Sequence, residues 1–142
     1  MLEEYAAWIG LDLAFQDFAE ELAGLPGDYA PPGGALLVAA TDVASGAPQT
    51  RLGMIALRRR SDTVCEMKRL YVRPSARGLG VAPALVDRVL EEARQRTYRT
   101  IVLDTLTMMT GAQRLYERLG FRDIPPYYDT PIAGTRFMGR EL

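Results

Sequence analysis

Short apolar runs along the chain predict the strands of a sheet. Turn residues at Ala44-Ser45-Gly46 and Arg60-Ser61-Asp62 separate the first three runs, which predicts an antiparallel meander. The predicted strands cover residues 35–40, 51–57, 64–72, 100–103, 121–124 and 135–138. These strands share the chain with helical patterns, so the sequence favours an α/β domain with a mixed, mainly antiparallel sheet and helices on both faces.

Apolar residues at a spacing of three and four predict the helices. The clearest pattern starts directly after Gly80 and has charged residues on its opposite face. Two short helices are expected before the first strand, broken near Gly10 and ended by Pro26-Gly27. Their apolar positions are Tyr5, Ala6, Trp8, Ile9, Leu13, Phe15, Phe18, Leu22 and Leu25. Thr110 with Gln113 is predicted as a capping box that opens a last helix, closed by Gly120.

Composition narrows the possible chemistry. The 142 residues suit one domain over 1–142. The chain has no histidine and one cysteine, Cys65, so we expect no metal site, no disulfide and no histidine-based nucleophile, with Cys65 as a small core residue. The net charge of −1 predicts no nucleic-acid partner, and Arg58-Arg59-Arg60 is interpreted as a solvated strand end. No targeting or membrane segment is recognised, which predicts a cytoplasmic location.

A glycine-bearing turn joins the predicted strand 64–72 to the following helix. The first N–H groups of a helix lack partners and carry the positive end of its dipole, so an anion is stabilised there when no side chain blocks it. Gly78 and Gly80 leave that approach open, and Pro83 falls in the first turn, where its missing N–H matters least. A Walker loop is excluded because Gly-Lys-Ser/Thr is absent, and Pro83 replaces the third glycine of a dinucleotide motif.

The segment from Arg77 to Ala82 resembles the Arg/Gln-x-x-Gly-x-Gly/Ala signature of the GNAT superfamily of N-acetyltransferases. Residues 65–72, 101–104 and 112–121 are similar to further family segments in the family's order, and 124–128 look like a group of small bacterial members. The resemblance implies the GNAT fold, with its first strand missing from this chain. Either the start is truncated or the sheet lacks that edge, which would leave a strand edge for a homodimer to protect.

The same resemblance implies acetyl-CoA as the co-substrate. The turn would surround the pyrophosphate, and the pantetheine arm would pair with the strand backbone at Leu70 and Val72. The implied cofactor-binding residues are Leu70, Tyr71, Val72, Arg77, Gly78, Leu79, Gly80, Val81 and Ala82. Met109 replaces an asparagine that many members use toward the cofactor arm.

The implied reaction is direct attack of a primary amine on the thioester. By resemblance, Tyr116 would protonate the leaving thiolate, and Glu66, Asp104 or an ordered water would take the amine proton. The alternatives are a Glu66 paired with Lys68, an Asp104 that caps a turn, and a Tyr116 that only packs in the core. A backbone N–H near Leu70 would meet the oxyanion.

The acceptor is left open between a small-molecule amine and a protein amine. Four aromatic residues would flank the acceptor side or serve as ordinary core and loop residues: Tyr5, Trp8, Tyr127 and Tyr128. Two rival functions remain at this level. One is a transferase for a longer acyl-CoA, which requires a roomier cleft near Tyr116, and the other is a CoA-binding regulatory module without catalysis.

Overall fold

Six strands form one sheet in the computed structural model, which describes residues 1–10, 17–42 and 47–142. The strands are β1 (Ala35–Ala40), β2 (Arg51–Arg59), β3 (Val64–Val72), β4 (Thr100–Thr105), β5 (Arg122–Asp123) and β6 (Arg136–Glu141). Their order across the sheet is β1-β2-β3-β4-β6-β5. The turn expected at 44–46 and the apolar positions Leu13 and Phe15 lie outside the described residues.

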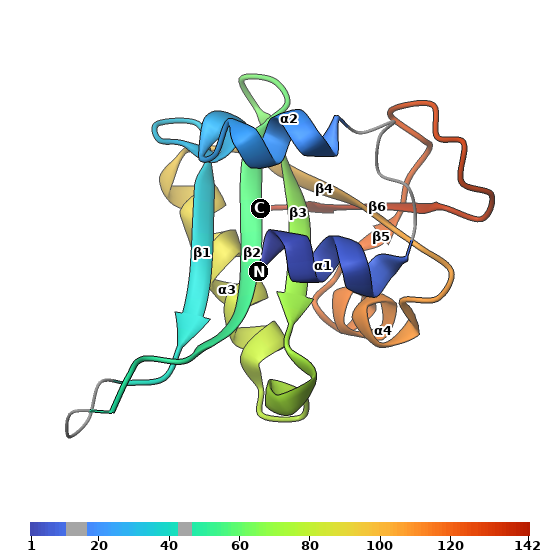
Figure 1. Ribbon diagram of the computed structural model, residues 1–142. Coiled ribbons are helices and arrows are strands. Elements are labelled where there is room, and N and C mark those ends of the chain that lie inside the picture. The colour runs from blue at the N-terminus through green and yellow to red at the C-terminus, as the bar shows by residue number, and fades with distance from the viewer. Residues whose placement is uncertain (11–16, 43–46) are drawn as a thin grey trace.

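The sheet is mainly antiparallel, as predicted. Among the described strands only β3 and β4 run parallel, and the connection between them contains the long helix α3 (Val81–Gln95). The helices α1 (Leu2–Ile9) and α2 (Phe18–Ala23) precede β1, so the first described strand follows both of them, as the family resemblance implied. Figure 1 shows α1 on one face of the sheet and α3 on the other. No helix in the described part of the chain is long and apolar enough to cross a membrane.

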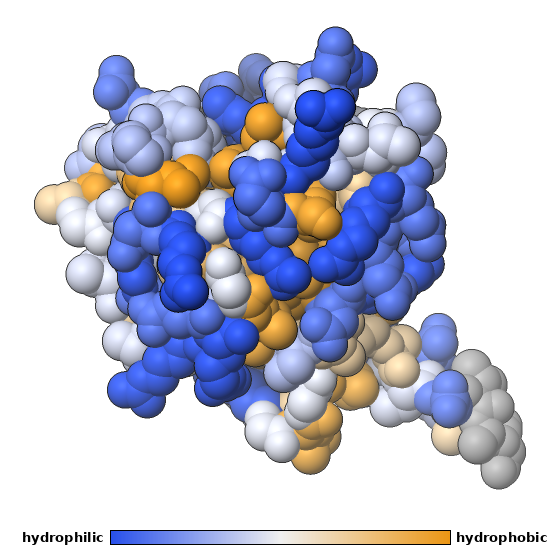
Figure 2. All heavy atoms as spheres, turned by 180° about the vertical axis from the view of Figure 1, so that it is seen from behind, coloured by the Kyte–Doolittle hydropathy of each residue, from blue (hydrophilic) through white to orange (hydrophobic). Residues whose placement is uncertain are grey.

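Each face of the sheet has its own apolar core. The larger core joins the sheet to α3 and α4 (Thr110–Arg118), and the smaller one joins it to α1 and α2. The buried residues of α3 are Leu85, Val86, Val89, Leu90 and Ala93. Burying a large aliphatic side chain contributes roughly 1.5–3 kcal/mol, so this stripe fixes α3, and with it the turn at its N-terminus, against the sheet. From behind, hydrophilic side chains dominate the surface, with apolar atoms showing between them (Figure 2).

The strands β3 and β4 separate partway along their length. They pair from Val64↔Thr100 only to Glu66↔Val102, and no further pair follows. On its other side β3 contains a bulge, since the register with β2 passes from Lys68↔Ala56 to Tyr71↔Met54 with one extra residue in β3. Arg69 takes a left-handed backbone conformation there, with φ 59°. A bulge leaves part of the ladder unpaired, so the end of β3 has backbone groups available to a ligand.

Several helix boundaries test the sequence predictions. The breaks at Gly10 and Gly120 are confirmed, because both glycines have positive φ just past a helix. The capping box is wrong: α4 has Met109 as its N-cap, with no side-chain cap, and Gln113 instead donates to the carbonyl oxygen of Leu106 at 2.8 Å. The helix begins one residue earlier than a cap at Thr110 requires. The helix α2 ends at Ala23, before the predicted stop.

Candidate active site

A groove of about 440 Å³ lies between the end of β3 and the N-terminal parts of α3 and α4. Its lining combines the predicted cofactor segment with residues from three helices. The lining residues are Trp8, Leu70, Tyr71, Val72, Ala76, Arg77, Gly78, Gly80, Val81, Ala82, Pro83, Met108, Met109, Gly111, Ala112, Leu115 and Tyr116. We call this cavity the donor groove. Eight of the nine predicted cofactor residues line it, while Leu79 does not and is 70% exposed.

The glycine turn opens α3 as the sequence predicts. Gly78 and Gly80 both have φ 78°, and a Cβ at either position would meet nothing within 4 Å. Glycine is therefore favoured by the backbone conformation, and the space beside the turn is open. Gly80 is the N-cap of α3 and offers no capping side chain. Arg77 is held at the turn, since its Nε donates to the carbonyl oxygen of Val72 at 3.2 Å and its guanidinium lies 5.2 Å from the ring centroid of Trp8.

A second cavity of about 40 Å³ adjoins the donor groove. We call it the inner cavity. The two cavities share the lining residues Leu70, Met109 and Tyr116. Its other lining residues are Tyr5, Ile9, Met67, Lys68, Arg69, Leu103, Asp104, Thr105, Leu106 and Ile132. The separated strands β3 and β4 supply most of these residues, so the divergence of the two strands creates the cavity.

Tyr116 stands where the two cavities meet. It is 6% exposed and packs against Phe121, with ring centroids 5.8 Å apart. Within the described residues its hydroxyl has no hydrogen-bond partner. Burial raises the pKa of the Tyr116 phenol, and Tyr5 and the charge of Asp104 add to the shift. The phenol is therefore protonated at neutral pH and available as a donor.

The two candidate carboxylates differ in their access to the cavities. Asp104 lines the inner cavity, and its Oδ2 accepts a hydrogen bond from the Tyr128 hydroxyl at 2.7 Å. Glu66 is completely buried and lines neither cavity. Asp104 lies within β4 rather than in a turn, so the turn-capping alternative is wrong.

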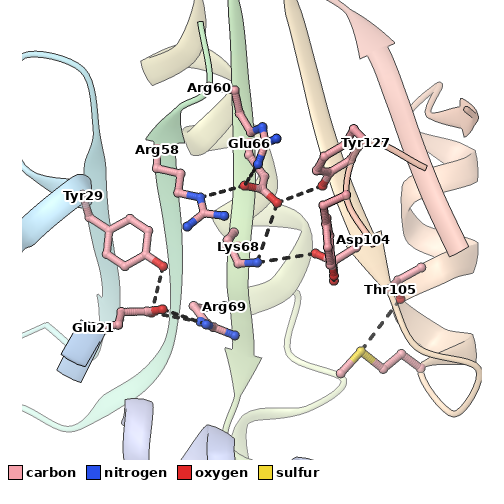
Figure 3. Close-up of polar contacts among 12 residues, drawn as sticks. Glu21, Tyr29, Arg58, Arg60, Glu66, Lys68, Arg69, Asp104, Thr105 and Tyr127 are labelled. Atoms are coloured by element: carbon pink, nitrogen blue, oxygen red, sulfur yellow. Dashed lines mark hydrogen bonds and ion pairs between the residues drawn. The ribbon is translucent and has the colours of Figure 1, made fainter. Parts of the chain in front are cut away.

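Glu66 is the centre of a buried ionic cluster (Figure 3). Its Oε2 accepts from Arg58 Nε at 2.7 Å and lies 3.6 Å from Arg60 Nη1. Its Oε1 accepts from the Tyr127 hydroxyl at 2.8 Å and lies 3.6 Å from Lys68 Nζ. The predicted pairing with Lys68 is therefore present. The interpretation of this run as a solvated strand end is confirmed for Arg59 and Arg60, which are exposed, but not for Arg58, which is half-buried and donates to Glu66.

Removing the charge of Glu66 is expected to destabilise the protein. In Glu66→Gln, three cations would lose their common counter-charge, and breaking a buried ion pair costs about 3–5 kcal/mol. We expect a lower free energy of unfolding in urea titration. Asp62→Asn is the matched control, since Asp62 pairs with Arg59 at the exposed surface and such pairs contribute about 0–1 kcal/mol. Equal stability of the two variants would contradict this account of the cluster.

Lys68 links the two carboxylates. Its Nζ lies 3.6 Å from Glu66 Oε1 and 3.7 Å from Asp104 Oδ1, and the side chain is 5% exposed. Burial lowers the pKa of the Lys68 ammonium, while the charges of Asp104 and Glu66 oppose that shift. The neighbouring Arg69 pairs with a different carboxylate, Glu21, which accepts from its Nε at 2.9 Å and its Nη2 at 2.7 Å.

The four predicted acceptor-side aromatics occupy different places. Tyr5 lines the inner cavity, whereas Trp8 is 43% exposed and lies on the donor groove. Tyr127 and Tyr128 line neither cavity but donate to Glu66 and Asp104. Their rings also pack on each other, with centroids 5.6 Å apart. The loop that carries Tyr127 and Tyr128 thus holds both carboxylates by hydrogen bonds.

The sequence analysis missed one residue of the site, Ile132, and gave only part of the position of two others, Lys68 and Met109. Lys68 was considered only as a partner of Glu66, but its side chain also lies beside Asp104 of β4. Met109 is at the junction of the two cavities, where its sulfur lies 3.8 Å from Thr105 Oγ1. Ile132 reaches the inner cavity from a loop with no sequence pattern.

Cys65 is a fully buried core residue, as predicted, and burial raises the pKa of its thiol to about 12.

The sequence and the fold both resemble those of known acetyltransferases. A model of the acetyltransferase (GNAT) family matches residues 4–121. An uncharacterized N-acetyltransferase from Schizosaccharomyces pombe is 38% identical over 143 aligned residues, which cover 100% of this chain and 85% of that protein. The chain therefore belongs to the GNAT family of acetyltransferases.

Two further proteins share part of the sequence or the fold. The N-acetylaspartate synthetase of Homo sapiens is 38% identical over 93 residues, which cover 65% of this chain and 29% of that protein. A GNAT family acetyltransferase from Elizabethkingia anophelis, solved with acetyl-CoA bound, has a TM-score of 0.57 at 17% identity over 75% of this chain and 98% of that chain. That likeness shows the shared fold.

Proposed function

We propose that this protein transfers the acetyl group of acetyl-CoA to a primary amine by direct attack on the thioester. The observation that carries the proposal is the place of Tyr116. Its unpartnered hydroxyl stands at the opening between the donor groove and the inner cavity, and Asp104 faces the inner cavity. A proton donor and a proton acceptor thus stand along one path through the protein.

The donor groove suits coenzyme A. The open glycine turn at the N-terminus of α3 offers unpaired N–H groups to a pyrophosphate, and Arg77 adds a cation beside it. The free edge of β3 at Leu70 and Val72 offers backbone groups to the pantetheine arm. A longer acyl chain would extend past Tyr116 into the inner cavity of about 40 Å³ and compete with the acceptor for that space, so the cavity favours an acetyl group.

The chemistry follows from these positions. Asp104 takes a proton from the acceptor ammonium, because a free alkylamine is mostly protonated at neutral pH. The amine nitrogen then bonds to the thioester carbon, and the backbone N–H of Leu70 stabilises the oxyanion at the bulge. As the carbon–sulfur bond breaks, Tyr116 donates its proton to the thiolate. The nitrogen then loses its second proton, which restores the Tyr116 phenol directly or through water, and the proton on Asp104 passes to solvent. Glu66 takes no part in these transfers and serves to hold Lys68 and Tyr127.

The acceptor is a small molecule in this proposal. A small inner cavity admits an amine with few attached atoms and excludes a folded surface, although a flexible chain end would also enter. The N-acetylaspartate synthetase similarity supports a small acceptor, since the name of that relative gives a small acetylated product.

The first experiment is acetyl-CoA binding by calorimetry with wild type and Gly80→Glu. A carboxylate at the turn repels the pyrophosphate, so we expect the dissociation constant to rise at least about tenfold, which is ~1.4 kcal/mol. Gly10→Glu is the matched control, because Gly10 also has positive φ and open space but lies outside both cavities. A thiol-release assay across primary amines then tests turnover.

The outcomes separate the rival functions. Tight binding with thiol release for at least one amine supports the proposal. Tight binding without thiol release for any amine favours a regulatory module. Faster thiol release from a longer acyl-CoA than from acetyl-CoA would reverse the choice of donor. Absence of wild-type binding would overturn the assignment of the donor groove.

A further inference from the structure

The ammonium of Lys68 is buried without a hydrogen bond. The side chain is 5% exposed and lines the inner cavity, but its two carboxylate neighbours lie at 3.6 and 3.7 Å, beyond hydrogen-bond distance. Within the described residues Lys68 Nζ donates no hydrogen bond at all. The ammonium is thus ion-paired but not hydrogen-bonded, and its three N–H bonds can donate to a ligand in the inner cavity.

Opposite charges face the inner cavity side by side. Asp104 Oδ2 accepts from Tyr128, whereas Oδ1 is the oxygen that faces Lys68 Nζ at 3.7 Å. This anion and cation form a complementary pair for a ligand whose own cation and anion are separated by a single carbon. The zwitterion of an α-amino acid has this arrangement. We propose that the acceptor is a small α-amino acid, whose amine faces Asp104 and whose α-carboxylate binds Lys68.

A simple alkylamine fits the same cavity less well. Its ammonium would approach the charges of both Lys68 and Arg69, while the donors of Lys68 would stay unsatisfied. An α-carboxylate on the ligand removes both disadvantages, because its oxygens accept from Lys68 and its charge balances the two cations. Arg69 does not compete for it, since Glu21 holds its guanidinium through two nitrogens.

The size of the cavity limits the acceptor further. About 40 Å³ corresponds to roughly three water-sized groups, given ~10–15 Å³ for each. That space holds the amine, the α-carbon and the carboxylate, and it leaves no room for a long side chain. Glycine and alanine are therefore the first probes. This inference rests on the proposed acetyl transfer only for its turnover assay, since binding tests it separately.

The wild-type test compares each amino acid with its own amide. Glycine and alanine are measured against glycinamide and alaninamide, which retain the amine and lose the carboxylate charge. We expect kcat/KM for the acids, corrected for the fraction of neutral amine, to exceed that for the amides by roughly 10- to 100-fold, as a charged hydrogen bond is lost. Equal corrected values would overturn the inference while leaving acetyl transfer to amines intact.

The variant test replaces Lys68 with methionine. In Lys68→Met we expect the ratio of kcat/KM for glycine to kcat/KM for ethylamine to fall roughly 10- to 100-fold, with the KM for acetyl-CoA unchanged. Arg60→Met is the matched control, because Arg60 also neutralises Glu66 but does not line the inner cavity. Equal losses toward glycine and ethylamine would place Lys68 at the thioester and overturn the inference.

A binding measurement keeps the inference testable without turnover. Calorimetry of glycine with the CoA-saturated protein should give heat in wild type and Arg60→Met, and none in Lys68→Met. Glycine binding without any thiol release would sustain the amino acid site and reject the acetyl transfer. Absence of glycine and alanine binding, with amines acetylated, would reject the site and sustain the transfer. A thermal melt of Lys68→Met shows whether the variant folds, and the acid–amide comparison decides if it does not.

Discussion

Asparagine at position 104 is expected to lower kcat/KM for amine acetylation by about 10²- to 10⁴-fold, the usual contribution of a positioned general base. The amide keeps the shape of the side chain and still accepts a hydrogen bond from Tyr128, but it takes no proton from an ammonium. Steady-state kinetics with acetyl-CoA and the best amine would measure the loss. Calorimetry should show unchanged acetyl-CoA affinity, since Asp104 does not line the donor groove.

Asp123→Asn provides the control for this substitution. Asp123 lies on β5, is paired with Arg136 at 2.5 Å, and lines neither cavity, so its loss should leave kcat/KM near the wild-type value. If Asp104→Asn retained wild-type kcat/KM, the base would have to be a bound water, and Asp104 would only orient the site.

Removal of the Tyr116 hydroxyl is the second large effect. In Tyr116→Phe the thiolate leaves without a proton donor, so we expect kcat to fall about 10²- to 10⁴-fold. The ring and its contact with Phe121 remain, and so the acetyl-CoA dissociation constant should hold. Rapid quench of a single turnover would show the loss in the chemical step itself.

A second phenol separates this role from a general effect of hydroxyl removal. Tyr98 donates to the carbonyl oxygen of Gly33 at 2.8 Å, and it lines neither cavity. Tyr98→Phe should lose stability of about 0.5–1.5 kcal/mol and keep its kcat. Unchanged single-turnover rates in Tyr116→Phe would reject the general acid and leave Tyr116 as a packing residue.

Most of the fold was predictable because its signals are local. The long helix was placed correctly from the spacing of its apolar residues and the glycines before it. All six predicted strands were found. The errors have local causes too. A capping box depends on a single residue, and the actual start of α4 at Thr110 moved Gln113 away from the position that the motif needs.

The donor side of the site was predictable for the same reason. One contiguous segment from β3 to α3 supplies the glycine turn, Arg77 and most of the groove. The acceptor side was not, because it is assembled from α1, β3, β4 and the C-terminal loop. Sequence spacing carried no sign that Tyr128 donates to Asp104 or that Tyr127 donates to Glu66.

The sequence by itself determined the family, through segments that resemble the family's motifs. It also determined the mixed sheet and the open turn at the start of α3, since both follow from neighbouring residues and their periodicity. It placed Glu66 on one strand and Asp104 at the end of the next, but it left their roles equal. Tertiary structure decided between them: the strands separate beyond Glu66, so one carboxylate is enclosed by cations and the other faces a cavity. Access and charge balance are properties of the packed neighbourhood, and residues far apart in the chain create them.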